Sequence, residues 1–84
     1  MDAMTDVTHD PDRSRFRADA AHLEYTRGGD ELTLLHTVVP EELGGQGLGG
    51  RLVQAAVDYA QAEGLAVVPV CSFARRWLEK HPAA

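Results

Sequence analysis

The chain has 84 residues, and its 44% hydrophobic and 25% charged residues are ordinary for one folded domain. The net charge of −5 argues against nucleic acid as the main partner, because phosphate backbones are bound by clustered Lys and Arg side chains. The single cysteine excludes an internal disulfide, no apolar run approaches the roughly 18 residues of a membrane span, and the N-terminus lacks a signal-peptide pattern. These features predict a single-domain cytoplasmic protein with no membrane partner.

The N-terminal segment "MDAMTDVTHDPD", residues 1–12, is predicted to be a flexible acidic arm. It carries four Asp and no Lys or Arg. Such a composition buries too little apolar surface to order the chain. The folded domain is therefore placed at residues 13–84, and its first element is a short strand expected in "RSRFRAD".

A β-hairpin is predicted over residues 21–39. Its two apolar arms flank "RGGDE", in which residues 28–30 can supply the positive φ angles of a hairpin turn. Pro40 would end the second arm, because proline cannot donate to a strand ladder. Both faces of this arm carry apolar residues, so it is predicted to be covered on both sides, near the middle of a sheet. One of these faces would consist of Leu32, Leu34, His36 and Val38.

Two helices and one further strand are predicted in the second half of the chain. Apolar residues recur at spacings of three and four over residues 49–63, which indicates a helix, and Gly64 is placed to cap it. "LAVVPVC" is a β-branched run of strand length, and "SFARRWLEKH" is a second helix with Ser72 as its N-cap and Phe73 and Trp77 in its buried stripe. The last strand should lie parallel to the second hairpin arm, because strand–helix–strand units cross over right-handedly. The predicted fold class is α/β, with a small mixed sheet of about four strands and two helices.

The stretch "EELGGQGLGG" places five glycines between the hairpin and the first helix. Ligands of open α/β sheets bind outside the carboxyl ends of strands, and a helix N-terminus attracts phosphate. Glycines there leave no Cβ to hold a phosphate away, so the loop is predicted to bind a phosphate-bearing ligand, although a plain strand-to-helix turn is the alternative. The loop is neither a P-loop nor a dinucleotide fingerprint. The predicted binding residues are Gly45, Gln46, Gly47, Leu48, Gly49, Gly50 and Arg51.

Beyond this loop, the chain resembles the GNAT superfamily of acyl-CoA N-acetyltransferases, and within it the small single-domain yjdJ-type branch. The superfamily signature is Arg or Gln, two variable residues, Gly, a variable residue, then Gly or Ala, and it aligns with "GGQGLG", residues 44–49. The chain departs from it at Gly44, where Arg or Gln is usual, and it lacks the acidic residue that usually follows the branch's His-Pro. The other elements of the branch are His36-Thr37, Pro69-Val70-Cys71 and His81-Pro82.

The resemblance implies a minimal GNAT-like fold that binds acetyl-CoA as acyl donor. The third and fourth strands would splay at their carboxyl ends, the pantetheine arm would bond the backbone of Val38 and Val39, and the pyrophosphate would rest on residues 45–50. The implied activity is N-acyl transfer from the CoA thioester to an amine of a protein or small molecule. The alternative is a CoA-binding or interaction module with weak or no turnover.

Two residues are candidates for catalysis. Cys71 ends the last predicted strand and could be a nucleophile or a general acid for the departing thiolate, whereas most free cysteines are small buried hydrophobes. His36 could be the general base for the amine, or a histidine at the edge of the core. No Tyr follows Cys71, although the resemblance would favour one as acid. The four histidines show no metal-ligand spacing with Cys71, so no metal is predicted.

Overall fold

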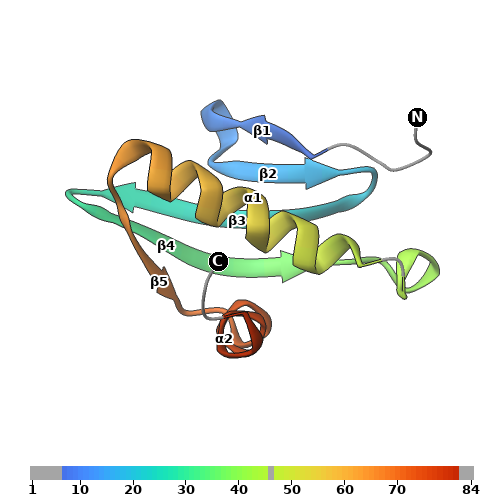
Figure 1. Cartoon of the computed structure of the whole chain (residues 1–84). Coiled ribbons are helices and arrows are strands. Elements are labelled where there is room, and N and C mark those ends of the chain that lie inside the picture. Colours follow the sequence, from blue (N-terminus) through green and yellow to red (C-terminus); the bar gives the residue numbers. More distant parts are fainter. Residues whose placement is uncertain (1–6, 46, 82–84) are drawn as a thin grey trace.

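The structure, a computed structural model, describes residues 7–45 and 47–81. Its strands form one sheet in the order β1-β2-β3-β4-β5, in which β1 to β4 pair antiparallel and β4 and β5 pair parallel (Figure 1). The predicted α/β class, with antiparallel strands before a parallel strand–helix–strand unit, is confirmed. The strands are β1 (Thr8–Asp10), β2 (Arg15–Ala18), β3 (Ala21–Gly28), β4 (Glu31–Val38) and β5 (Ala66–Pro69). The helices are α1 (Leu48–Glu63) and α2 (Ser72–Lys80), with the 3₁₀ turns η1 (Pro11–Arg13) and η2 (Glu41–Leu43).

The prediction of a flexible arm over residues 1–12 is corrected by β1, because residues 8–10 pair with β2 and residues 11–13 form η1. Residues 1–6 lie outside the described chain. His9 supplies the reason. Its ring stacks on Phe16, with centroids 4.3 Å apart, and its Nε2 lies 2.6 Å from the Tyr25 hydroxyl oxygen. Burial lowers the pKa of His9 below its ordinary value, although Asp10 opposes this. His9 therefore anchors β1 through aromatic packing, which the acidic composition of the segment does not indicate.

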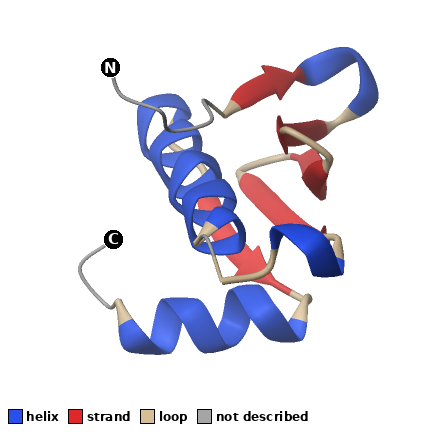
Figure 2. Cartoon of the chain, turned by 90° about the vertical axis from the view of Figure 1, so that its right-hand side faces the viewer, coloured by secondary structure: helices blue, strands red, loops and turns tan. Residues whose placement is uncertain are grey.

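Helix α1 packs along one face of the sheet and forms the core with it (Figure 2). The helix ends as predicted at Gly64, whose φ of +71° lets its N–H reach the carbonyls of Ala60 and Gln61. Neither α-helix lies on the opposite face of the sheet in this view, so the prediction that β4 is covered on both sides is wrong. The largest fully buried side chains are those of Leu23, Leu32, Leu34, Leu52 and Val53.

A β-bulge interrupts β4 next to the carboxyl end of β5. Along β3 the register advances by one residue from Glu24 to Tyr25, while along β4 the matching partners are His36 and Leu34, so Leu35 is the extra residue. Side chains on the two sides of a bulge exchange faces, because the alternation shifts by one. His36 is therefore exposed, whereas Leu34 is fully buried. The predicted face shared by Leu32, Leu34, His36 and Val38 is broken at this point.

Helix α2 lies beside β5, at the end of the sheet where the parallel pair stands (Figures 1 and 2). The N-cap residue of α2 is Cys71. The prediction that Ser72 is the N-cap is therefore wrong, because Ser72 is the first residue of the helix. Ala74 is its buried residue. Phe73 is 40% exposed, which corrects its assignment to the core, whereas Trp77 is partly buried and packs against the core.

Candidate functional site

The parallel strands β4 and β5 separate at their carboxyl ends. Their register pairs stop at Leu34 and Pro69, and the N–H groups of Val70 and Cys71 both donate to the Leu34 carbonyl oxygen at 3.0 Å. The bulge at Leu35 follows at once, and from there β4 continues to Val38 while the other chain turns away into α2. The predicted splay of these strands is present, and the bulge is its local cause.

A cleft of about 540 Å³ lies between the separated strands. Residues 35–38 of β4 line it on one side, and residues 70–73 at the start of α2 line it on the other. Cys71 and His36, the two candidate catalytic residues, are both among the residues that line this cleft. Val38 also lines it and is 45% exposed. An open, mostly apolar channel beside a free strand edge suits an extended ligand arm that can bond to backbone groups.

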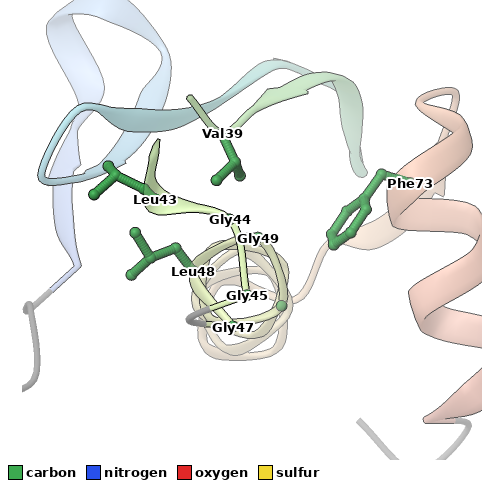
Figure 3. A pocket seen from close by; sticks show the side chains of 9 residues that line it. Val39, Leu43, Gly44, Gly45, Gly47, Leu48, Gly49 and Phe73 are labelled. Atoms are coloured by element: carbon green, nitrogen blue, oxygen red, sulfur yellow. The ribbon is translucent and has the colours of Figure 1, made fainter. Parts of the chain in front are cut away.

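The glycine loop borders a second cavity, of about 280 Å³, at the N-terminus of α1 (Figure 3). Gly45 and Gly47 have φ angles of +84° and +75°, conformations that side chains rarely adopt. Gly47 is the N-cap of α1 and gives no side-chain cap, so the first N–H groups of the helix have no such partner. Unpaired N–H groups and the positive end of the helix dipole together favour an anion.

The predicted binding residues divide between neighbouring cavities. Gly45, Gly47, Leu48, Gly49 and Gly50 all line the loop cavity, together with Val39 from the end of β4. Val38, the next residue back, lines the cleft, so the two cavities follow each other along the chain. Arg51 lines a further cavity, of about 580 Å³, between α1 and α2. Gln46 lies outside the described residues.

Two of the glycines also make room for aromatic rings of α2. A Cβ on Gly49 would lie 2.6 Å from Cζ of Phe73, and one on Gly50 would lie 2.7 Å from Nε1 of Trp77. Such distances are closer than real contacts, so a side chain at either position would displace the neighbouring ring from its place in this structure. Four of the five glycines therefore have two kinds of role: backbone conformation at Gly45 and Gly47, and close approach of α2 at Gly49 and Gly50.

The environment of Cys71 favours a reactive thiol. Burial alone would raise its pKa, but the hydrogen bond with Thr37 and the backbone N–H groups of Ala74 and Phe73 together lower the pKa below its ordinary value. Sγ lies 3.5 Å from Thr37 Oγ1, and those two N–H groups belong to the first turn of α2, of which Cys71 is the N-cap. A helix N-terminus is a known cause of lowered thiol pKa values, because it favours the thiolate.

Thr37 and Phe73 are the functional candidates that the sequence reasoning missed. In the sequence Thr37 stands out only as part of a His-Thr pair, and its contact with Cys71 depends on the bulge, which turns Thr37 to the side of α2. Phe73 was assigned to the core on helical spacing alone. His36 is exposed and lies on the other face of β4 from Thr37, where it pairs in register with Glu24 of β3. The thiol therefore has Thr37, and not His36, as its hydrogen-bond partner.

Replacing Thr37 with Val should raise the pKa of Cys71, because it removes the hydroxyl that stabilises the thiolate and keeps the side-chain shape. The rate of alkylation by iodoacetamide follows the thiolate fraction and falls as the pH drops through the pKa. As the chain has one cysteine, the readout belongs to Cys71 alone. We expect the Thr37→Val profile to shift to higher pH and the Thr37→Ser profile to stay near that of the parent. Coincident Val and parent profiles would show that Thr37 does not tune this thiol.

Metal ligands do not gather at this site. Within residues 7–45 and 47–81, no group of three or more His, Cys, Asp and Glu side chains is placed to hold a metal ion. In the same part of the chain, no helix is long and apolar enough to cross a membrane. The absence of a metal stays a prediction.

A glycine loop at a helix N-terminus, beside two separated parallel strands, defines an α/β protein with a site suited to a phosphate-bearing ligand. The sequence model of the GCN5-related N-acetyltransferase family matches residues 13–84. The solution NMR structure of a GCN5-like candidate N-acetyltransferase from Staphylococcus aureus is similar, with a TM-score of 0.76 and 30% identity over 98% of this chain and 85% of that one. No curated protein matches. The chain belongs to the GCN5-related N-acetyltransferase family.

Proposed function

We propose that the chain transfers an acyl group, most simply acetyl, from a CoA thioester to an amine. The observation that carries this proposal is the continuity of three features. The cleft between β4 and β5 holds Cys71, the cleft is followed by the glycine-loop cavity, and that cavity opens at the N-terminus of α1. A CoA thioester has the matching order: an acyl–sulfur group, an extended amide arm and a diphosphate.

The donor would bind with its pantetheine arm along the free edge of β4. Beyond Leu34 this edge has no register partner in β5, so the backbone groups of residues 35–38 are available to amides of the arm. The diphosphate would lie on the N–H groups of residues 47–50, where the helix dipole attracts negative charge. Gly44 replaces the Arg or Gln of the family signature, so this cradle depends on backbone groups.

The lowered pKa of Cys71 supports a nucleophilic role, because the thiolate and not the thiol attacks a thioester. A bond forms between Sγ and the acyl carbon while the acyl–sulfur bond of the donor breaks, and CoA leaves as a thiolate that takes a proton. The amine nitrogen then attacks the acyl carbon, the acyl–Sγ bond breaks and regenerates the Cys71 thiolate, and the new amide nitrogen loses a proton. His36 borders the same cleft and would accept that proton.

The second candidate function is CoA binding without turnover. It is favoured by the position of His36, which is exposed and lies on the opposite face of β4 from Thr37, the hydrogen-bond partner of Cys71. In this case the cleft and loop would hold the cofactor while the acid–base groups stay too far apart for efficient transfer.

One experiment separates these functions. The protein is mixed with acetyl-CoA and a panel of amines, the released CoA thiol is measured, and an acetyl adduct on Cys71 is sought by mass spectrometry. A transferase gives amine-dependent thiol release. A binding module gives none, but CoA at about 100 times its dissociation constant adds about 2.7 kcal/mol to the unfolding free energy, a rise of roughly 10 °C or more in Tm for a domain of this size. If neither response occurs, the proposal fails.

A further inference from the structure

Phe73 occupies an unusual place for a large apolar side chain. It lies in the first turn of α2, two residues after Cys71, and 40% of its surface is exposed. Figure 3 shows its ring pointing from α2 towards the first turn of α1, opposite Leu48 across the glycine loop. The core does not hold this ring, so a change of rotamer costs it few contacts.

The ring touches α1 at a position without a side chain. Its Cζ and Cε2 atoms would lie 2.6 and 2.9 Å from a Cβ on Gly49. The tip of the ring therefore rests on the bare helix backbone and bridges the gap between the start of α2 and the start of α1.

Phe73 borders both parts of the candidate site. The cleft beside Cys71 and the glycine-loop cavity share one lining residue within the described chain, and that residue is Phe73. A ligand that occupies both parts has to pass the ring. A displaced ring has space available, because Phe73 also lines the cavity of about 580 Å³ towards Trp77.

We infer that Phe73 is a donor-specificity residue that acts as a movable barrier: its ring closes the passage between cleft and loop in the free protein and swings aside to admit a full CoA thioester. The inference rests on the proposed function. Ligands confined to one part do not meet the ring, so the ring controls the binding only of donors long enough to span both parts. If the open rotamer is populated at about 10% or less, the association rate for CoA is reduced about tenfold or more.

The test compares association rates of three probes by stopped flow: CoA, which spans both parts, pantetheine, which fits the cleft, and adenosine 3′,5′-bisphosphate, which carries the phosphate-rich end. Phe73→Ala should raise the rate for CoA about tenfold and leave the two shorter probes within about twofold. Phe73→Leu, which keeps an apolar contact on Gly49 but shortens it, should give a smaller rise, and Phe73→Trp should give none or a decrease.

The rate is the decisive readout, because lost packing between ring and ligand changes dissociation more than association. An unchanged CoA rate in Phe73→Ala overturns the barrier, and so does an equal change for all three probes, which would indicate a general structural effect. Failure of the proposed function looks different: the parent protein and all variants then bind none of the probes.

Discussion

Replacing Cys71 with Ala should lower amine-dependent release of CoA by about a hundredfold or more and leave CoA binding nearly unchanged. A group that reacts with or protonates the substrate contributes on the order of 10² to 10⁴ in rate. The effect on binding is small because Cys71 is only one wall of a cleft that residues 35–38 line on the other side. The measurement is thiol release at saturating acetyl-CoA, with CoA affinity determined separately by calorimetry.

Cys71→Ser is the matched control for this variant. Serine keeps the size and the contact with Thr37 but is a poor nucleophile without an activating base. If Cys71 forms the acyl intermediate, the Ala and Ser variants both lose activity and the acetyl adduct. If both variants keep the activity of the parent, Cys71 is a packing residue and the proposed chemistry is wrong.

The second large effect is expected at the glycine loop, where Gly47→Asp should weaken CoA binding about tenfold to a hundredfold more than Gly47→Asn. Both side chains tolerate the positive φ at this position, and a Cβ there meets no atom within 4 Å. The two variants therefore differ chiefly by one negative charge. Like charges about 4 Å apart at an effective dielectric constant near 20 cost up to about 4 kcal/mol, and each 1.4 kcal/mol is tenfold in affinity.

Calorimetric titration of both variants with CoA and with pantetheine gives the comparison. The gap between Asp and Asn should shrink as salt is added, because screening weakens the repulsion, and it should be absent for pantetheine, which carries no phosphate. Equal CoA affinities for the two variants would mean that the diphosphate does not approach Gly47.

The elements set by local chemistry were predictable from the sequence. The turn between β3 and β4 falls at Gly29, with a φ of +58°, and α1 ends at Gly64, which has a left-handed backbone. Both follow from residues that adopt positive φ easily. The apolar stripe of α1 likewise marked its buried face, because helical spacing alone decides which residues share a side.

The elements set by contacts between distant residues were not predictable. His9 is ordered by Phe16 and Tyr25, which follow it by 7 and 16 positions, and nothing in the acidic segment indicates this packing. No residue near Leu35 indicates a bulge in the sequence, yet the bulge determines that Thr37 contacts Cys71 and that His36 does not.

The glycine loop shows both cases together. Its place before a helix predicts an anion site, but the roles of Gly49 and Gly50 depend on rings more than 20 residues later, in α2. A glycine kept for a ligand and a glycine kept for packing look alike in a single sequence, because both only report that a side chain would be in the way.

The cleft and the glycine loop together should bind one CoA molecule, with its thioester end in the cleft and its diphosphate at the loop. The most direct test is a titration of ¹⁵N-labelled protein with CoA and with pantetheine, followed by amide chemical shifts. CoA should shift the amides of Val38 and of Gly47 and Gly49 together, whereas pantetheine should shift Val38 and leave the two glycines unchanged. Shifts that avoid the glycine amides on CoA addition, or that gather on another part of the chain, would contradict the account.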